Sequence, residues 1–322
     1  MKRIFLLFTF IACSSILSAS PSWVTDAGRR KVFPEAEYIS ALGTAFNEDQ
    51  AKSKAALAVS EYINTQISSS TKTRYSESEK NGTVIEEKSL EEEVQLLSSS
   101  NVYALEYTEP FYDSDSTRYY CVSYIEKAAA WRLVKPKLQK LSSEIESLLQ
   151  GTSEDRSGFW KTLCFGKVVN SEKEFYSLYD FAVLVNKSGA ANYTQCAQKI
   201  LNAKNSLIQN KETQTVLLKV QNDKNAKVYR ALAEYFESKG FTVGARNGKY
   251  ICNAQASVDV RDDRSAFVSY PGLSLEVTDA FGIQIASYNI SGKKTVGFKK
   301  ESTEEKSYKV LENECSKIEW IK

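Results

Sequence analysis

The sequence predicts an α+β protein made of two helix-backed antiparallel-sheet modules joined by a helical spacer. Short alternating strands accompanied by a helix occur on both sides of a central region whose apolar residues recur at helical spacing. The 322 residues are enough for two modest domains. We therefore expect a signal peptide at 1–19, a first α+β domain at 20–131, a helical spacer at 132–212 and a C-terminal α+β domain at 213–322.

The first segment has the pattern of a secretory signal. Lys2 and Arg3 precede an uncharged, mostly apolar run from 4 to 17, and small residues follow at 18–20. This run is shorter than the roughly 20 apolar residues of a membrane-spanning helix. We therefore expect cleavage after Ala19 and no transmembrane span in the mature chain.

A second interpretation of the same segment is a lipid anchor. Phe10-Ile11-Ala12-Cys13 is similar to a loose bacterial lipobox, which makes Cys13 a possible lipidation site. The usual Leu three places before the cysteine is missing, and Ile16 and Leu17 continue the apolar pattern beyond it. Either outcome places the protein in the periplasm or on the periplasmic face of the outer membrane.

The first domain is predicted to begin with a strand at 37–45 and a helix that follows Asn47, a favourable capping residue. The polar stretch 68–82 ends in an Asn-Gly pair and suggests a hairpin arm. The arm that returns from it could instead hold a helix at 89–97. A clear hairpin at 104–127 and the start of another helix complete the domain.

Several short motifs of this domain resemble the bacterial envelope family typified by the twenty-kilodalton lipoprotein "Lpp-twenty". Some members of that family are associated with the flagellar outer-membrane apparatus. The resemblance covers roughly residues 21–135 and implies a compact α+β domain in the envelope without a catalytic centre. The motifs, in order, are Pro21-Ser22-Trp23-Val24, Tyr38-Ile39-Ser40-Ala41-Leu42-Gly43-Thr44-Ala45, the Ala/Lys-rich helix at 50–66, and Tyr119-Tyr120-Cys121-Val122-Ser123-Tyr124-Ile125-Glu126-Lys127.

The spacer shows heptad-like apolar spacing at Leu138, Leu141, Ile145 and Leu148. This pattern predicts helices that pack on one another, or alternatively a surface for a partner helix or an oligomer. The C-terminal domain is expected to contain a strand at 215–221, a helix that ends at Gly240, several alternating strands and a final helix at 303–320.

The two α+β domains share a faint internal similarity. Residues 47–58 and 222–233 align without gaps and match at six of twelve positions. We predict that both domains have one strand order, and that Ala51, Ala58, Ala226 and Ala233 face their sheets. Most of the matching residues are common helix formers, so shared composition is the alternative explanation.

The composition limits the possible chemistry. The chain contains no histidine, which excludes Ser-His-Asp and Cys-His catalysis and histidine-bound zinc. Lys and Arg number 42 against 40 acidic residues, and removal of Lys2 and Arg3 leaves 40 against 40, so no nucleic-acid partner is expected. Five cysteines follow Cys13 at wide spacing, as isolated buried thiols or as partial disulfides.

The densest charge cluster comprises acidic residues and arginines in one short stretch. It lacks the glycine that a calcium loop needs at its turn, so we interpret it as the solvated end of a hairpin. No catalytic, cofactor-binding or metal-binding residue is predicted, and no cofactor. The residues of the cluster are Asp259, Arg261, Asp262, Asp263 and Arg264.

These observations predict a non-enzymatic exported envelope protein with a structural or accessory role in an outer-membrane or flagellar-associated assembly. Its partners would be envelope proteins or other copies of itself. One alternative is a periplasmic ligand- or glycan-binding module that uses the Tyr-rich strands. The other is a carboxylate-based hydrolase, which would need two acids facing each other across a cleft.

Overall fold

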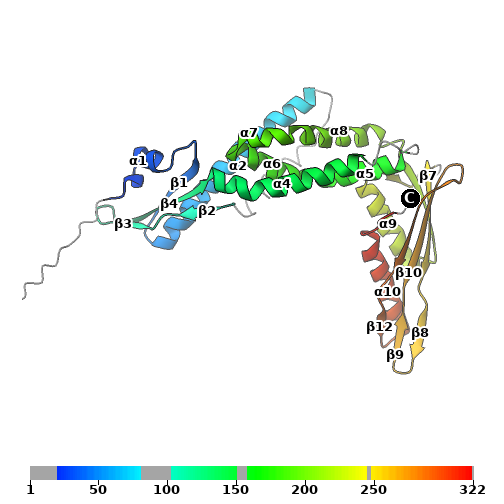
Figure 1. Cartoon of the computed structure of the whole chain (residues 1–322). Helices are drawn as coiled ribbons and strands as arrows, with labels where there is room; N and C mark the ends of the chain where they lie inside the picture. Colours follow the sequence, from blue (N-terminus) through cyan, green and yellow to red (C-terminus); the bar gives the residue numbers. More distant parts are fainter. Residues whose placement is uncertain (1–19, 81–102, 151–157, 245–247, 321–322) are drawn as a thin grey trace, which may run out of the picture. The chain divides into compact units, whose positions relative to one another are not determined.

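The computed structural model describes residues 20–80, 103–150, 158–244 and 248–320. It shows the predicted α+β class (Figure 1). The chain forms two compact units, one of residues 1–71 and 94–133, the other of residues 72–93 and 134–322, and each is described by itself. The predicted signal peptide and Cys13 lie outside the described residues.

The first unit contains a four-stranded antiparallel sheet. Strand β4 pairs with β1 on one side and with both β2 and β3 on the other. Two short helices, η1 (Ser22–Val24) and α1 (Asp26–Val32), precede the sheet. The strands are β1 (Tyr38–Ala45), β2 (Leu105–Tyr107), β3 (Phe111–Asp113) and β4 (Arg118–Glu126).

Helix α2 (Glu48–Lys80) is longer than the sequence suggests. Asn47 caps it, because its Oδ1 accepts a hydrogen bond from the Gln50 amide at 2.8 Å. The polar arm predicted over 68–82 is wrong for 68–80, which continue the helix, and the Asn-Gly turn lies outside the described residues. Ser and Thr lower helix propensity only slightly, and extension of an existing helix needs no new nucleus. The buried face of α2 comprises Ala51, Ala55, Val59, Ile63 and Ile67.

The helical part of the second unit packs through the stripes predicted for the spacer. Leu138, Leu141 and Ile145 of α4 are buried. Lys199 pairs with Glu146 of α4, and Lys204 pairs with Glu172 of α6, each at 2.9 Å. The helices are α4 (Lys127–Gln150), whose residues from Val134 belong to this unit, α5 (Phe159–Asn170), α6 (Glu172–Val185), α7 (Lys187–Ala190), η2 (Ala191–Tyr193) and α8 (Thr194–Asn210).

A five-stranded sheet in the order β11-β10-β7-β5-β6 forms the centre of the C-terminal region. Strand β5 runs parallel to β6 and β7, so the predicted purely antiparallel sheet is wrong at this point. A helix between β5 and β6 returns the chain to the edge where β5 began, which makes the next strands parallel. The strands are β5 (Thr215–Gln221), β6 (Thr242–Val243), β7 (Tyr250–Ser257), β10 (Gly272–Asp279) and β11 (Gln284–Ser291).

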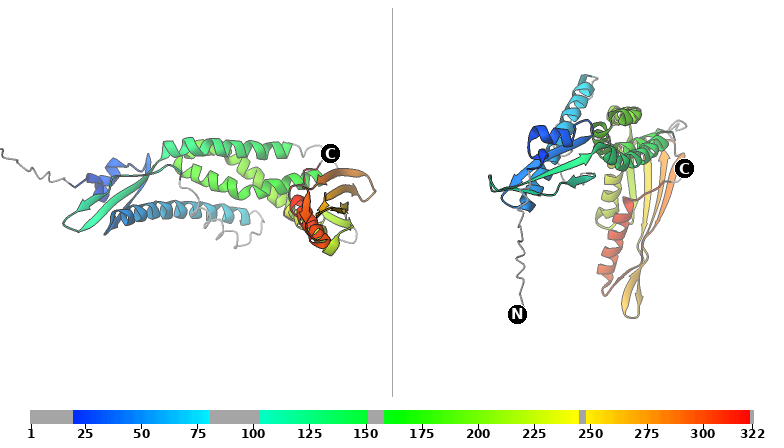
Figure 2. Two further views of the ribbon diagram at one scale, coloured as in Figure 1. Left: turned by 90° about the horizontal axis from the view of Figure 1, so that it is seen from below. Right: turned by 60° about the vertical axis from the view of Figure 1, so that its left-hand side comes forward.

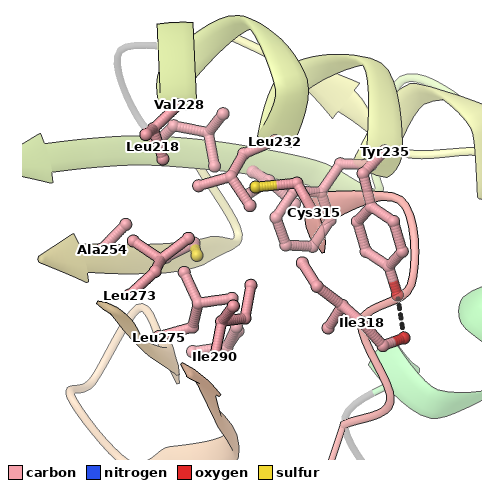
Figure 3. Close-up of a cluster of buried hydrophobic side chains, with 14 of the residues drawn as sticks. Leu218, Val228, Leu232, Tyr235, Ala254, Leu273, Leu275, Ile290, Cys315 and Ile318 are labelled. Carbon is pink, nitrogen blue, oxygen red and sulfur yellow. Dashed lines mark hydrogen bonds between the residues drawn. The ribbon is translucent and has the colours of Figure 1, made fainter. Parts of the chain in front are cut away.

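Two helices, α9 (Lys227–Ser238) and α10 (Lys300–Cys315), lie side by side on one face of this sheet (Figures 1 and 2). Helix α9 follows the short helix η3 (Lys224–Ala226). The core lies between sheet and helices, and Figure 3 shows it with Leu218, Val228, Leu232, Tyr235, Ala254, Leu273, Leu275, Ile290, Cys315 and Ile318 labelled. Phe159 and Leu163 of α5 belong to the same core. The predicted domain boundary at 212 stays a prediction.

A three-stranded sheet in the order β12-β9-β8 extends from the five-stranded sheet. Its strands are β8 (Val260–Asp263), β9 (Ala266–Ser269) and β12 (Thr295–Gly297). Helix α10 packs on one of its faces, where the Thr295 and Ser307 hydroxyls lie 2.7 Å apart. We call this the distal sheet.

The predicted structural repeat is wrong. The first unit has an antiparallel sheet in the order β1-β4-β2, whereas the C-terminal sheet is mixed and has a different order. Ala51 is buried against its sheet, but Ala226 is exposed and has a left-handed backbone, with φ of 53°. The residues that match between the two segments are therefore common helix formers and do not mark a structural repeat.

Cys121, Cys196, Cys252 and Cys315 are buried free thiols, in agreement with the expectation of isolated core thiols. Within the described ranges, no helix combines the length and the apolar character needed to cross a membrane.

Candidate functional site

The distal sheet has one face on α10 and one face that stays open. Alternation along β9 and β12 sends Ser269 and Thr295 towards α10, where both are buried. Val268 and Val296 stand opposite each other on neighbouring strands and point the other way. Val268 lies between Val296 of β12 on one side and Arg261 of β8 on the other. The open face thus has an apolar centre with a charged neighbour.

Large apolar side chains gather on this open face. Tyr270 is 67% exposed, Val296 48% and Phe298, directly after β12, 91%. We call Val268, Tyr270, Val296 and Phe298 the distal patch. Exposed apolar patches with polar surroundings mark sites of interaction in soluble proteins. The distal patch is therefore the candidate binding surface of the second unit.

A hollow of about 500 Å³ adjoins the distal patch. Ser257, on the open face of β7, lies at one side of it and Lys294 at another. Arg261 Nε donates a hydrogen bond to Asp259 Oδ2 at 2.8 Å, and both side chains are exposed. The residues that line it are Ser257, Asp259, Arg261, Asp262, Asp263, Val268, Tyr270 and Lys294.

The structure thus brings most of the sequence-predicted charge cluster to one place. Asp259, Arg261, Asp262 and Asp263 all line the hollow, whereas Arg264 lies at the hairpin turn with φ of 53°. The cluster is the exposed β8–β9 hairpin, as the sequence indicated. Within the described ranges, no group of three or more His, Cys, Asp or Glu side chains is placed to hold a metal ion.

Sequence reasoning missed the distal patch. The segment 294–298 has an alternating pattern that predicts a strand, and a strand normally buries its larger side chains. Here the small residues Thr295 and Gly297 face α10, and a Cβ built at Gly297 would lie 2.5 Å from the Thr303 Oγ1. The close helix forces the larger residues Val296 and Phe298 outward. The signal in the sequence that could have indicated this exposure was the alternation of small Thr295 and Gly297 with large Val296 and Phe298.

Two further hollows are less suited to a functional role. One in the first unit has about 150 Å³ beside Arg29, Phe33 and Tyr38, below the usual 300–1,000 Å³ of ligand sites. One in the second unit has about 400 Å³ beside Ile208 and Phe241. Apart from backbone, the polar lining of the second is limited to Lys211, Glu237 and Thr242.

The strongest pKa shifts among the described residues belong to core groups. Burial raises the pKa values of Cys252, Cys315 and Tyr235 to about 12. These groups lie between the sheet and its helices and do not line any of the three hollows. Their shifts follow from packing and indicate no reactive centre.

The comparisons with known proteins add little to this picture. No protein-family model matches the chain, and no curated protein matches it. A minor lipoprotein from Acinetobacter baumannii is 11% identical with a TM-score of 0.26, over 32% of this chain and 86% of the other. A secreted protein from Helicobacter pylori is 11% identical with a TM-score of 0.31, over 86% and 97%. Similarity this low supports no conclusion, so the predicted family resemblance stays a prediction.

Proposed function

We propose that this chain is a non-enzymatic, exported bacterial envelope protein that acts by binding other envelope proteins. The observation that carries the proposal is the distal patch, an exposed aromatic and aliphatic surface on a folded sheet. Export is supported by the basic start, apolar run and small residues of segment 1–20. A role in an outer-membrane or flagellar-associated assembly is what the family resemblance adds.

The distal patch has the chemistry of a protein–protein contact. Burial of a side chain such as Phe298 or Tyr270 in an interface would contribute about 1.5–3 kcal/mol. Arg261 and Lys294 beside Asp259 provide charges of both signs at the rim, which orient a partner more than they hold it. Such a division between an apolar centre and a polar rim is typical of protein interfaces.

The same surface supports binding better than catalysis. A carboxylate-based hydrolase places two acids on opposite sides of a bound substrate. Here Asp262 and Asp263 are neighbours on the single strand β8, and Asp259, just before that strand, is already paired with Arg261. The chain has no histidine to serve as a base. We infer that the protein is not an enzyme.

Site-specific photo-crosslinking in intact cells of the native host tests the binding function. A photoreactive residue in place of Phe298 should give discrete adducts with envelope proteins, because the side chain would lie inside the contact. Tyr270→Ser, made in the same protein, should reduce those adducts about tenfold, the effect of losing about 1.4 kcal/mol. A photoreactive residue at Leu57, an exposed apolar position of the first unit, is the matched control.

Identical adducts from positions 298 and 57, or no change with Tyr270→Ser, would show that the distal patch is not the contact. Circular dichroism of each variant confirms that the fold is intact. Assays with general glycosidase and esterase substrates test the absence of catalysis. Turnover that is lost when Asp262 and Asp263 are changed to Asn would overturn that part of the proposal.

A second candidate function is glycan binding in the hollow beside the distal patch. Its volume of about 500 Å³ lies within the range of ligand sites. An aromatic ring such as Tyr270 can stack on a sugar while the Asp262 carboxylate accepts hydrogen bonds from hydroxyl groups. Calorimetric titration with soluble cell-wall fragments tests this candidate. Saturable heat that Tyr270→Ala abolishes and Leu57→Ala leaves unchanged would favour it.

A further inference from the structure

Strand β11 forms a free edge of the five-stranded sheet. It pairs with β10 on one side, and no other strand in the described residues pairs with it. Gly292 N–H donates to the Pro271 carbonyl at 2.7 Å, which identifies 271–292 as a hydrogen-bonded pair. Alternate pairs along an antiparallel ladder are hydrogen-bonded, so the backbone groups of Ser287, Asn289 and Ser291 point to the open side.

This edge has little of the usual protection against pairing, because its register shift, at Ile285, lies near the start of the strand and leaves 286–291 regular. Natural edge strands are short, charged, bulged or interrupted by proline. The eight residues of β11, Gln-Ile-Ala-Ser-Tyr-Asn-Ile-Ser, contain no charge and no proline. The strand at the opposite edge, β6, has only two residues. The longer and less protected edge of the sheet is therefore β11.

We propose that β11 pairs in antiparallel orientation with β11 of a second copy of this chain, with the two-fold axis at Tyr288. The pairing would join the two five-stranded sheets into one continuous sheet. It deepens the proposed function by naming one partner, the chain itself, and rests on that function.

The side chains of β11 are complementary to themselves in this register. Ser287 faces Asn289 of the second copy, and the two residues exchange both backbone hydrogen bonds. On the helix-covered face, Ala286 stands opposite Ile290 of the second copy, which sets a small residue against a large one. Tyr288 meets its own equivalent at the axis. Because β11 is uncharged, no like charges meet anywhere along the pairing.

Charge complementarity at the two ends favours a second copy over another strand. Lys293 follows one end of β11 and the turn at 279–283 precedes the other end, so antiparallel pairing brings Lys293 of one copy to the turn of the other. The Asp279 carboxylate accepts hydrogen bonds from the amides of Phe281 at 2.9 Å and Ile283 at 2.8 Å, which places a negative charge at that turn. A lysine thus meets a carboxylate at each end. Phe281 and Ile283 are 90% and 65% exposed, and the second copy would bury part of both side chains.

Sedimentation velocity of the purified protein over a range of concentrations tests the inference. The wild-type protein should sediment at twice the monomer mass. Ser287→Lys combined with Asn289→Lys sets Lys opposite Lys at both symmetric positions and should weaken the dimer about tenfold or more. Ser287→Lys combined with Asn289→Glu sets Lys opposite Glu and should restore it. Asn253→Lys, on the same open face of the central strand β7, is the matched control and should leave the dimer unchanged.

A wild-type protein that is monomeric at every concentration would overturn the inference, as would a Lys/Lys variant that dimerises like the wild type. Failure to restore the dimer with the Lys/Glu variant would show that the register is wrong. If β11 pairs with a different protein, the wild type should sediment as a monomer, and a protein that co-purifies with the wild type should be absent from the Lys/Lys variant. That result would also contradict the proposal. The crosslinks from position 298 report on the distal patch separately, so either idea can fail alone.

Discussion

At the scale of single residues, Tyr235 ties helix α9 to the end of the chain. Its hydroxyl donates to the Ile318 carbonyl at 3.5 Å and accepts a hydrogen bond from Trp320 Nε1 at 2.9 Å. Burial raises the pKa of this tyrosine to about 12, although the Trp320 hydrogen bond acts in the opposite direction. The phenol is therefore kept neutral where an exposed tyrosine would ionise.

The raised pKa of Tyr235 predicts a loss of stability in alkali. The unfolded tyrosine ionises near pH 10 and the folded one near 12, so its contribution is complete below 10 and lost as the pH rises towards 12. Cys252 and Cys315, shifted from 9 to about 12, act in the same direction. Tyr235→Phe should lower the unfolding free energy by about 1 kcal/mol at neutral pH and flatten its fall above pH 10.

Urea unfolding followed by circular dichroism, repeated from neutral pH to about pH 12, measures both effects. Tyr229→Phe on the same helix is the control, because its half-buried side chain only packs against the rim of the core. An equal alkaline slope in wild type and Tyr235→Phe would contradict the prediction.

At the scale of elements, the contact between α2 and β1 depends on one glycine. A Cβ built at Gly43 would overlap the Ala51 carbonyl oxygen and the Ala55 amide nitrogen. The helix therefore approaches the strand with backbone against backbone at this point. Alanines at positions 51 and 55 of the helix, both fully buried, permit the approach from the other side.

We expect Gly43→Ala to destabilise the first unit by about 1–3 kcal/mol, because an overpacked contact must push the helix from the sheet. Gly272→Ala in β10 is the matched control. A Cβ there would meet its nearest atoms at 3.6 and 3.9 Å, which is ordinary contact, so stability should change little. Thermal unfolding of the two variants is the measurement, and equal midpoints would show that the α2–β1 contact can adjust.

The segments that seemed to repeat differ at the start of their helices. Asn47 caps α2 directly, whereas Asn222, Asn225 and Ala226 adopt left-handed backbone before α9. The cap of α9 is instead Asp223, whose carboxylate accepts from the amides of Val228 and Tyr229. The aligned residues therefore lie almost entirely in a helix at 47–58, but in a turn followed by a helix at 222–233.

At the scale of the whole molecule, the prediction concerns the processing of segment 1–19, which we propose to be an export signal. We expect a mature N-terminus at Ser20, because the apolar run ahead of Cys13 is short and continues through Ile16 and Leu17. Intact-mass spectrometry of the protein purified from its native envelope measures this. A chain that begins at an acylated Cys13 would show that the protein is lipid-anchored.

The sequence by itself determined the class of the fold and the apolar stripes of several of its elements. The alternation of β4 and β7 and the stripes of α4 are local patterns, because each follows from the repeat of a strand or helix. The capping of α2 by Asn47 could also be predicted, because a helix cap depends on residues next to it in the sequence. The position of the charge cluster on an exposed hairpin also followed from its immediate neighbours.

Only the tertiary structure decided strand direction, the exposed patch and the free edge. The parallel pairing of β5 with β7 depends on where the chain re-enters the sheet after α9, which no local pattern encodes. Val296 and Phe298 are exposed because α10 lies against Gly297 on the opposite face. The edge of β11 is open because no other described strand reaches it. Periodicity identifies the two faces of a strand, but contacts between distant segments decide which face and which edge are covered.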